Sequence, residues 1–587
     1  MNTLWSLALY FIIGISYGNA QISFQNQANL LDVDVAYGFG FLGGGISLFD
    51  YNNDGWDDLT ISSTDGTDFY FFKNNNGSFE IDPIGIDGGN LQTKQVIWVD
   101  YDNDGDYDFF AASDSGNSKL FRNDGNNTFI DITSASGLPD DGVLDTFGAS
   151  WGDYNNDSYL DVFLSIRDES QSIPNFLYRN NGDGTFSNVT EEAGLQLTGF
   201  ITFCAAFFDY DNDGYQDIYM ANDKYATANI LYHNNGDGTF EDVSASSGAN
   251  LVMGAMSTTI DDYNNDGWLD IYISNDDQVV EDATVGNALL QNNGDGTFTN
   301  VAVATGTQFN SVGWGCVFLD ADNDGYKDLY VSSSETGQND ILTAAFYQQQ
   351  DDTTFARLDD IGMEEDVRTS YANAIGDIDN DGYPEIGVVN DRNEDIFLWK
   401  NVSNTTNNYL KIKLEGTASN TMGIGSWIEI SINGEKQYNY TLCGEGYLGQ
   451  NSATEFFGVG DATTIDYVKV SWLSGQVDLI ENVAVNQSLT IVEGENPLST
   501  ESFDNTIVFK IYPNPAQTVL HITPPTNFEE VNDSKAQIYD ITGRLLKTIL
   551  LQDTTTISVN DLKSGTYILT LTRTDNTVLS HQKFVKL

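Results

Sequence analysis

The sequence predicts an all-β protein: a seven-bladed β-propeller, then a β-sandwich-like module, then a small C-terminal β-sandwich. Three observations lead to this prediction. An acidic nine-residue stretch occurs seven times, with starts separated by 50, 53, 56, 53, 58 and 57 residues. A second motif, rich in Asn-Gly and Gly-Asp-Gly, alternates with it, and strand-like runs that lack both motifs follow Asn401. A fixed period of this size is typical of a propeller, solenoid or array.

The repeated acidic stretch predicts a metal-binding loop. Its fourth copy reads "DYDNDGYQD" from Asp209 and offers side-chain oxygens at positions 1, 3, 5 and 9, with the backbone carbonyl of position 7 as a fifth donor. Oxygen donors at such spacing suit a hard cation. The expected ligands are Asp50, Asn52, Asp54, Trp56, Asp58; Asp100, Asp102, Asp104, Asp106, Asp108; Asp153, Asn155, Asp157, Tyr159, Asp161; Asp209, Asp211, Asp213, Tyr215, Asp217; Asp262, Asn264, Asp266, Trp268, Asp270; Asp320, Asp322, Asp324, Tyr326, Asp328; and Asp377, Asp379, Asp381, Tyr383, Glu385.

Calcium is the expected ion, with up to seven bound. All donors are hard oxygens, and Mg²⁺ prefers to keep its waters. An EF-hand is excluded because position 12 is apolar in every copy and strand-like runs flank the loop, whereas an EF-hand needs a Glu there and helices on both sides. Position 6 is Gly except for Ser158, so the third loop fits least well. The alternative is an Asx-rich turn without metal.

The second motif predicts the other half of each blade. "NNGDGTF" hairpins begin at Asn180, Asn234 and Asn292, which gives about four strands per period, the content of one blade. The seventh period lacks this half, whereas "ISFQNQANLL" from Ile22 resembles it. We therefore expect residues 21–34 to complete blade seven and close a propeller of residues 21–402, leaving no open sheet edge.

The N-terminus and the charge indicate an exported, acidic protein. Residues 1–20 have an apolar core and small residues before a cleavage point, which predicts a signal peptide, with a transmembrane anchor as the alternative. The net charge of −63 argues against nucleic acid and anionic membranes as partners and favours cationic or metal-bridged ones. The three cysteines, Cys204, Cys316 and Cys443, are expected to be buried free thiols rather than a disulfide framework.

Two further modules are expected after the propeller. Residues 403–493 contain strand-like runs such as "YLKIKLEG" and "YVKVSWLSG", residues 494–507 form a polar linker, and residues 508–587 form a compact all-β pattern. From Asn505 onward there are 7 acidic and 8 basic residues. Nearly all the negative charge therefore belongs upstream, which favours a separate C-terminal module.

No catalytic residues are predicted. His233 occupies a hairpin position that holds Lys or Arg in other repeats, and Ser150 in "GASWG" lies in a strand rather than at the strand-to-helix turn of a nucleophile elbow. An acid follows each loop by six or seven residues. These acids form either ordinary turns or a binding face opposite the metal loops: Asp65, Asp114, Asp168, Asp223, Asp276, Glu335 and Asp391.

The motifs resemble known families. The loops and "NNGDGTF" hairpins resemble the FG-GAP/VCBS repeats of integrin α-type propellers, and the stretch from "NNYLKIKLEG" to "NQSLTI" resembles the ASPIC/UnbV domain. This combination is the arrangement of the cartilage acidic protein family. "YPNPA", "DITGRLL" and "LKSGTYIL" resemble the C-terminal sorting domain of type IX secretion cargo. The resemblance implies calcium and extracellular display. It also implies transit through the type IX secretion machinery, then removal of the tail with release or surface anchoring.

These observations lead to one functional hypothesis and one alternative. We expect a secreted or cell-surface calcium-binding propeller that acts in adhesion or ligand binding, towards an extracellular protein or polysaccharide, without catalysis. The alternative is an extracellular carbohydrate-active enzyme, a polysaccharide lyase or hydrolase, which uses the propeller face opposite the calcium loops. The sequence leaves the ligand open.

Overall fold

The computed structural model describes the chain as two compact units, residues 1–497 and 498–587. Within them, the described residues are 22–498 and 510–587, except 65–66, 87–90, 117, 126–127, 141, 225–226, 277–282, 335–342, 351–352, 524–533, 541–543, 552–554, 564 and 574–577. The expected signal peptide and residues 499–507 of the expected linker lie outside the described residues.

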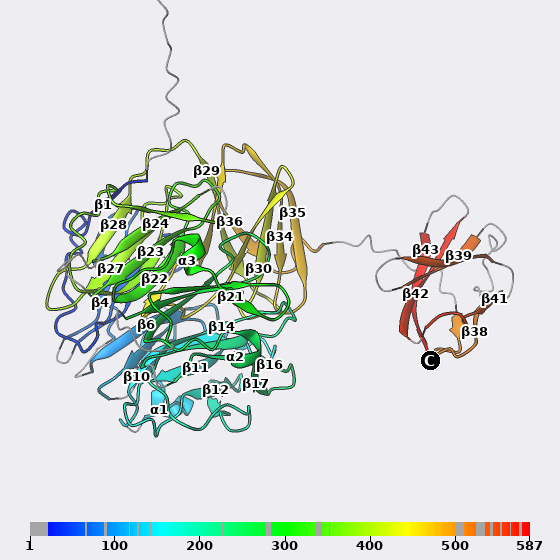
Figure 1. Cartoon of the computed structure of the whole chain (residues 1–587), viewed down its shortest axis with the longest axis horizontal. Coiled ribbons are helices and arrows are strands. Elements are labelled where there is room, and N and C mark those ends of the chain that lie inside the picture. The colour runs from blue at the N-terminus through cyan, green and yellow to red at the C-terminus, as the bar shows by residue number, and fades with distance from the viewer. Residues whose placement is uncertain are drawn as a thin grey trace, which may run out of the picture. The chain divides into compact units, whose positions relative to one another are not determined.

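The first unit contains the predicted propeller, which confirms the all-β fold class (Figure 1). Blades one to six each consist of four consecutive antiparallel strands in chain order. Blades one to three are β2 (Ile46–Phe49), β3 (Asp58–Ile61), β4 (Tyr70–Asn74), β5 (Phe79–Ile81); β6 (Thr93–Val99), β7 (Asp108–Ser113), β8 (Lys119–Asn123), β9 (Phe129–Asp131); and β10 (Thr146–Gly152), β11 (Asp161–Ile166), β12 (Phe176–Asn180), β13 (Phe186–Asn188).

Blades four to six follow the same order, and each metal loop joins the first two strands of its blade. Their strands are β14 (Thr202–Phe208), β15 (Asp217–Asn222), β16 (Ile230–Asn234), β17 (Phe240–Asp242); β18 (Ala255–Asp261), β19 (Asp270–Asn275), β20 (Ala288–Asn292), β21 (Phe298–Asn300); and β22 (Gly313–Leu319), β23 (Asp328–Ser333), β24 (Ala345–Gln349), β25 (Phe355–Leu358). One-turn helices follow three outer strands: α1 (Thr133–Ser136), α2 (Ser244–Ser247) and α3 (Ala302–Thr305).

Blade seven is completed by the N-terminal segment, as the sequence predicts. β26 (Ser370–Gly376), β27 (Glu385–Asn390) and β28 (Phe397–Asn401) come from the end of the propeller, and β1 (Phe24–Asn26) pairs antiparallel with β28 (Figure 1). Phe24 is 2% exposed and packs on Phe346 of the neighbouring blade. The ring is therefore closed by the first and last strands of the propeller, which are held together without a covalent bond.

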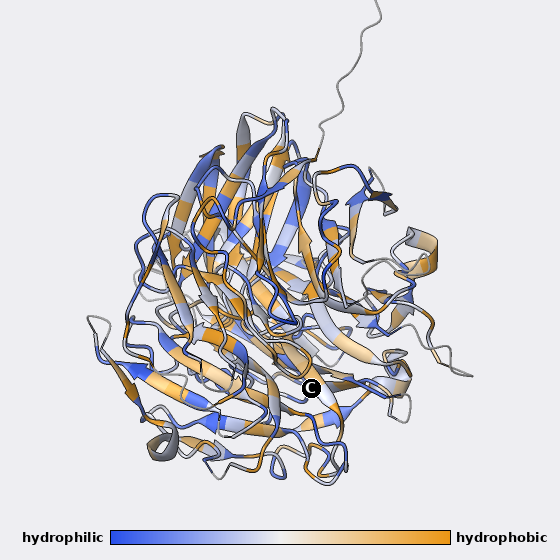
Figure 2. Cartoon of the chain, turned by 90° about the vertical axis from the view of Figure 1, so that its left-hand side faces the viewer, coloured by the Kyte–Doolittle hydropathy of each residue, from blue (hydrophilic) through white to orange (hydrophobic). Residues whose placement is uncertain are grey.

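Hydrophobic packing between blades holds the ring together. Inner strands such as β6, β10 and β14 are buried at every residue, and Trp98, Trp151 and Trp399 are fully buried. In Figure 2, hydrophobic stretches lie on many of the strands, alternating with hydrophilic ones. Cys204, Cys316 and Cys443 are buried free thiols, as expected. Ser150 lies in β10 and its Oγ accepts a hydrogen bond from the Phe207 backbone N–H, so it is a structural residue.

The second module, residues 403–497, is a two-sheet sandwich in the same compact unit as the propeller. Its sheets are β33-β29-β36 and β31-β30-β34-β35. The strands are β29 (Asn408–Glu415), β30 (Trp427–Ile432), β31 (Glu435–Tyr440), β32 (Gly449–Gln450), β33 (Thr454–Gly460), β34 (Thr464–Ser471), β35 (Val477–Ala484) and β36 (Gln487–Val492). Residues 494–497 remain attached to it, since the Asn496 carbonyl accepts the backbone N–H of Leu479 and the Asn496 N–H donates to the Asp478 carboxylate, both residues of β35.

A segment of this module fills the centre of the propeller. Residues 443–452, here called the plug, connect β31 to β33 and bond to the inner strands of blades one, two, three, five and seven. β32 within it pairs in parallel with β2, and the Gln450 amide bonds both backbone groups of Trp98. Tyr447 is fully buried against Phe203 and Trp314. The plug therefore belongs to the core of the propeller, whereas the two sheets of the second module enclose a core of their own.

The C-terminal module has its own core. It contains β37 (Lys510–Tyr512), β38 (Val519–Thr523), β39 (Ser534–Asp540), β40 (Leu545–Leu550), β41 (Thr555–Ser558), β42 (Gly565–Arg573) and β43 (Val578–Lys586). These strands form the sheets β37-β38-β41 and β40-β39-β42-β43. Leu520, Ile538 and Phe584 are among the buried residues between them. The small C-terminal β-sandwich is thus present as expected.

Candidate metal centres

The seven loops share one hydrogen-bond pattern, anchored by the aspartate at position 1. In the fourth loop, Asp209 Oδ1 accepts the backbone N–H of Asp213 at 3.1 Å and Oδ2 accepts that of Gly214 at 2.9 Å. The same pair of bonds is present in the other six loops. Ser158 adopts the left-handed φ of 75° that glycine supplies elsewhere, so the third loop keeps the common geometry.

The acid at position 9 ties each loop to the third strand of its blade. Asp217 Oδ2 accepts the N–H of Tyr210 at 3.0 Å, and its Oδ1 accepts the N–H of Asn234 at 2.7 Å. Corresponding bonds to the third strand occur in every loop. Position 9 is therefore buried and rigid, and its carboxylate faces the loop interior.

Position 3 supplies oxygens that have no protein partner. At this position, four of the buried side-chain oxygens that the structure describes lack a hydrogen-bond partner: Asp102 Oδ1, Asp211 Oδ1, Asp322 Oδ1 and Asp379 Oδ1. In the same four loops, three carboxylates bring oxygens within 4.8 Å of one another. In the other three loops an asparagine holds position 3, and the amide of Asn52 lies 2.7 Å from Asp58. Buried oxygens without donors are costly, and a cation would satisfy them.

Because these carboxylates are buried, their ionised forms are unfavourable unless a counter-ion is present. Desolvation raises the pKa of Asp108 to about 9 and those of Asp153 and Asp209 to about 7. A cation would favour the ionised forms, so its affinity should rise with pH over this range. The donor set, made only of oxygens, fits a hard divalent ion.

Position 4 links the loops into a ring, a role that the sequence analysis missed. Asn212 Nδ2 donates to the Gly267 carbonyl of the next loop at 3.0 Å, and Asn380 Nδ2 donates to Gly55 at 2.9 Å, which joins loop seven to loop one. The other five asparagines make the equivalent bond. All seven have a left-handed φ near 57°. The Asn that stands at position 4 in every copy is the sequence signal that could have predicted this role.

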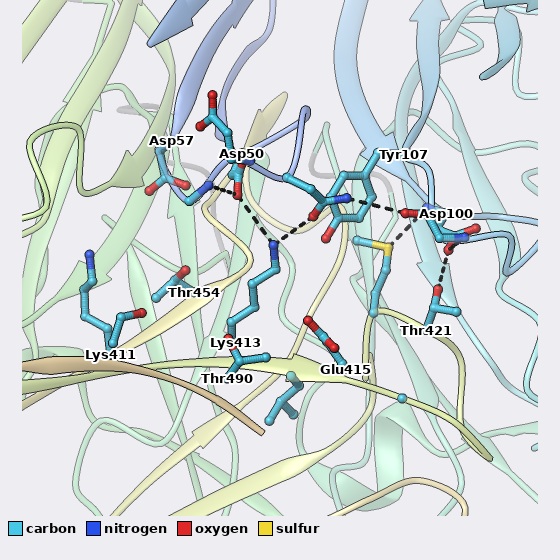
Figure 3. A pocket seen from close by; sticks show the side chains of 18 of the residues that line it. Asp50, Asp57, Asp100, Tyr107, Lys411, Lys413, Glu415, Thr421, Thr454 and Thr490 are labelled. Atoms are coloured by element: carbon cyan, nitrogen blue, oxygen red, sulfur yellow. Dashed lines mark hydrogen bonds and ion pairs between the residues drawn. The ribbon is translucent and has the colours of Figure 1, made fainter. Parts of the chain in front are cut away.

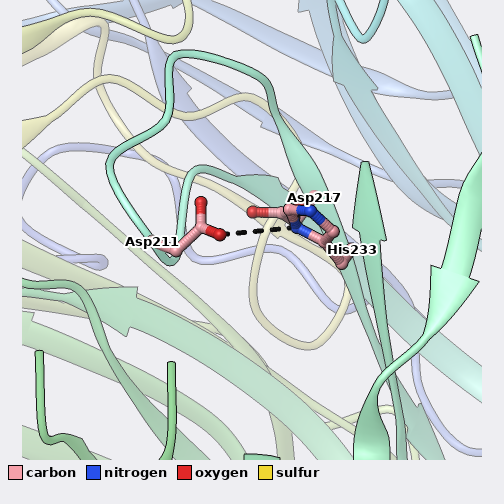
Figure 4. Close-up of side chains that lie close together, drawn as sticks. All are labelled: Asp211, Asp217 and His233. Atoms are coloured by element: carbon pink, nitrogen blue, oxygen red, sulfur yellow. Dashed lines mark ion pairs between the residues drawn. The ribbon is translucent and has the colours of Figure 1, made fainter. Parts of the chain in front are cut away.

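The third strand places a side chain over several loops. His233 Nδ1 lies 3.3 Å from Asp217 Oδ1 and 3.5 Å from Asp211 Oδ2 (Figure 4). At the equivalent position in loop one, Lys73 Nζ lies 3.1 Å from Asp54. This slot was expected to be a plain surface hairpin position. The structure instead places it beside the loop carboxylates, so His233 and its counterparts act as local counter-charges there.

The second module covers the face that carries the loops. Lys411 Nζ lies 2.8 Å from Asp377 Oδ2, Lys413 Nζ lies 3.5 Å from Asp50 Oδ2, and Thr421 Oγ1 donates to Asp100 Oδ2 at 2.6 Å. These three contacts reach loops seven, one and two. A cleft of about 590 Å³ remains between the loops and the second module, lined by residues of both (Figure 3).

Three of the acids that follow the loops are engaged within the protein. Asp168 accepts three backbone N–H groups of the turn that follows it, Asp114 pairs with Lys94 at 3.1 Å, and Asp223 is 2% exposed. Asp65 and Glu335 lie outside the described residues. Asp168 is thus a turn-forming residue and Asp114 an ion-paired one, whereas Asp391 keeps a buried Oδ1 without a hydrogen-bond partner among the described residues. The binding face remains a prediction.

Family models match three parts of the chain. FG-GAP-like repeats match residues 50–111, 100–164, 153–220, 209–273 and 262–331, an ASPIC and UnbV domain matches 416–498, and a secretion system C-terminal sorting domain matches 510–586. The chain is therefore an FG-GAP repeat protein with an ASPIC/UnbV domain and a type IX secretion sorting domain. This confirms the three resemblances, and the second module is hereafter called the ASPIC domain.

Cartilage acidic protein 1 is a homologue. The Xenopus tropicalis protein is 26% identical over 195 residues, which cover 32% of this chain and 29% of that protein. The Mus musculus protein is 25% identical over 197 residues, with the same two shares. The alignment thus spans less than a third of these relatives. Among solved structures, the extracellular domain of BT3049 from B. thetaiotaomicron aligns over 93% of this chain and 55% of that one, at 10% identity and a TM-score of 0.38.

The sorting domain indicates export to the cell surface or secretion, and it implies interaction with the secretion machinery. Within the described part of the chain, no helix has the length and apolar character needed to span a membrane.

Proposed function

We infer that this protein is an extracellular or cell-surface calcium-binding propeller that acts in adhesion or ligand binding. Each loop takes one Ca²⁺ through positions 1, 3, 5 and 9 and the carbonyl of position 7. The observation that carries this inference is the set of buried position-3 oxygens without partners, found beside two further carboxylates in loops two, four, six and seven. Calcium accepts six to eight oxygen ligands in flexible geometry, which suits a loop of this kind.

Calcium in these loops would stabilise the fold. It neutralises carboxylates that burial holds close together, and it does so on the face where the ASPIC domain docks. Binding to the folded chain alone raises stability by mass action. The mature protein would begin after the signal peptide of residues 1–20, present the propeller of residues 21–402 with the ASPIC domain, and lose the tail after export.

Calorimetric titration of the metal-free full chain with Ca²⁺ tests the proposal. We expect saturable binding of several ions with Kd values on the order of 10⁻⁴–10⁻³ M or tighter. The double variant Asp211→Asn/Asp213→Asn should reduce the stoichiometry by one. Its control is Asp183→Asn/Asp237→Asn, two exposed hairpin aspartates outside the loops. The proposal fails if millimolar Ca²⁺ produces no binding heat and no change in melting temperature.

The proposed role in ligand binding or adhesion is tested by a separate assay. The full chain, loaded with Ca²⁺, would be passed over immobilised polysaccharides and matrix proteins, and both retention and product release would be measured. Retention without product supports an adhesion or ligand-binding protein. Release of shortened glycan chains would instead establish the carbohydrate-active enzyme.

A further inference from the structure

Loop four differs from the other loops in the side chain that the third strand of its blade places beside it (Figure 4). His233 of β16 lies there, whereas the equivalent positions hold a cation or an amide: Lys73, Arg122, Arg179, Gln291, Gln348 and Lys400. We propose that loop four binds a transition-metal dication such as Zn²⁺ in preference to Ca²⁺, through His233 Nδ1 together with Asp211 and Asp217. The proposal rests on the proposed function, because it takes the loops to be metal sites.

The distances around His233 fit metal coordination better than hydrogen bonding. Its Nδ1 lies 3.3 Å from Asp217 Oδ1 and 3.5 Å from Asp211 Oδ2, and it forms no hydrogen bond with a described residue. N–H···O hydrogen bonds are usually about 2.7–3.2 Å long. Ligand atoms held about 2.0–2.1 Å from Zn²⁺ in tetrahedral geometry lie about 3.3–3.4 Å from one another. One ligand atom from each of the three residues lies within 4.8 Å of the other two, so small side-chain movements would close the site on an ion.

An imidazole changes which ion the loop prefers. Loops made only of oxygen donors suit Ca²⁺, whereas an imidazole nitrogen suits Zn²⁺ and related ions. A lysine or arginine at this position offers no lone pair, and a glutamine offers only a further oxygen as acceptor. The position lies close to the loop elsewhere too, since Gln348 Nε2 lies 3.2 Å from Asp322 Oδ2 in loop six. The chemistry of the side chain, rather than its placement, therefore distinguishes loop four.

The surroundings give this site a fixed base and an open side. Asp217 is fully buried, and its Oδ1 accepts the backbone N–H of Asn234 at 2.7 Å, which fixes the position of this oxygen. The Tyr210 ring meets the imidazole edge to face, with the ring centroids 5.9 Å apart, and so restricts its rotation. The side chains of Asp211 and His233 are 26% and 23% exposed, so an ion can enter from solvent.

Calorimetric titration of the full chain with Zn²⁺, with and without saturating Ca²⁺, tests the proposal. We expect one Zn²⁺ site that is at least about tenfold tighter than the Ca²⁺ sites, because nitrogen and carboxylate donors together favour a transition metal. Saturation with Zn²⁺ should lower the number of bound Ca²⁺ ions by one, since Asp211 and Asp217 belong to both ligand sets. Mg²⁺, which prefers oxygen ligands, should not displace the Zn²⁺.

His233→Gln is the main variant, because Gln291 and Gln348 hold this position in loops five and six of the same chain. It should keep the number of bound Ca²⁺ ions and the melting temperature in Ca²⁺. Its Zn²⁺ affinity should fall at least about tenfold, since even changes beyond the ligands cost about ten- to a hundredfold. His233→Lys, which introduces the residue type of loops one and seven, should lose Zn²⁺ affinity in the same way.

His521→Gln is the matched control. His521 lies on β38 of the C-terminal module, where its Nδ1 is 2.9 Å from Thr556 Oγ1. This variant should bind Zn²⁺ as the parent does. Imidazole NMR signals identify the ligand directly, because the chain has three histidines and His233 is the one in residues 1–497. Zn²⁺ should shift the signal that His233→Gln removes.

The outcomes separate this proposal from the proposed function. Unchanged Zn²⁺ affinity in both His233 variants, an unshifted His233 signal, or an undiminished number of bound Ca²⁺ ions at saturating Zn²⁺ overturns the proposal. If the chain binds Ca²⁺ but binds Zn²⁺ no more tightly, the proposal is overturned and the proposed function stands. If Zn²⁺ binds at His233 in a chain that binds no Ca²⁺, the calcium function is overturned and the His233 site stands.

Discussion

Two modules follow the propeller, and they relate to it in opposite ways. The ASPIC domain sends its plug into the centre of the ring, where Tyr447 is fully buried, and lies in one compact unit with the propeller. The C-terminal module forms a second unit whose core comes from its own strands. A strand-rich sequence that follows the propeller can thus encode either a module that shares in the folding of the propeller or a module that folds by itself. The position of the module along the chain does not tell which of the two it is.

Charge helps to explain this difference. The loop face of the propeller concentrates carboxylates, and the ASPIC domain brings Lys411 and Lys413 to it. The ASPIC domain as a whole is acidic, with 11 acidic and 4 basic residues in 403–497, so the complementarity is confined to the lysines that it places on the loops. The tail has 7 acidic and 8 basic residues from Asn505 onward, so its net charge is close to zero.

The largest expected effect comes from the plug. Replacing residues 443–452 with a Gly-Ser segment of equal length should prevent stable folding of the first unit, because hydrogen bonds to five blades are lost. Tyr447→Ala alone should lower the free energy of unfolding by about 3–5 kcal/mol, as for other large buried side chains. Circular dichroism during thermal unfolding measures the effect of the plug replacement and of Tyr447→Ala. A chain ending at Pro497 is the control and should melt like the parent. If the protein with the replaced plug also melts like the parent, the plug is not needed for folding, and the ASPIC domain would be as independent of the propeller as the tail.

Removing the closing strand should have the next largest effect. Deletion of residues 21–34 removes β1, which exposes the backbone groups of β28 and the apolar surface that Phe24 covers. We expect a lower melting temperature and aggregation in size-exclusion chromatography. Deleting residues 499–509, beyond the ASPIC domain, is the control. Undisturbed melting and solubility after the N-terminal deletion would mean that blade seven does not depend on this strand.

Calcium removal should affect the first unit and spare the tail. At a free concentration of about 100 Kd, each site contributes roughly 2.7 kcal/mol, so EGTA should lower the melting temperature of the first unit by many degrees. Differential scanning calorimetry resolves the two transitions. The transition of residues 498–587 should not shift. If EGTA does not change the melting temperature of the first unit, the assignment of the loops as metal sites is contradicted.

The smallest effect concerns pH at the interface between the propeller and the ASPIC domain. Burial raises the pKa of Glu455 to about 8 and that of Glu445 to about 7, near Asp261 and Lys327. An acid with a raised folded pKa stabilises the fold fully below its unfolded pKa of about 4.3, and this contribution is lost as pH rises through the folded value. Stability should therefore fall between about pH 4 and 8.

The matched comparison is Glu445→Gln/Glu455→Gln. Both proteins keep the metal-loop carboxylates, so these contribute equally to the pH dependence of each. Melting temperatures between pH 4.5 and 8.5 should fall less steeply in the variant. Parallel curves would show that these two glutamates do not titrate in this window.

The sequence by itself determined the repeated units, because each is encoded by contacts within a few residues. The bonds from Asp209 to Asp213 and Gly214 span four and five positions, and the same spacing recurs in seven copies. The alternation with hairpins indicated four-stranded blades, and the pattern at Ile22 indicated the closing strand. Only the tertiary structure showed the plug, the cleft and Lys413 beside loop one. Gln450 meets Trp98 across 352 positions, and no periodic pattern marks either residue. Such contacts depend on how completed modules fit together, so local sequence carries no signal for them.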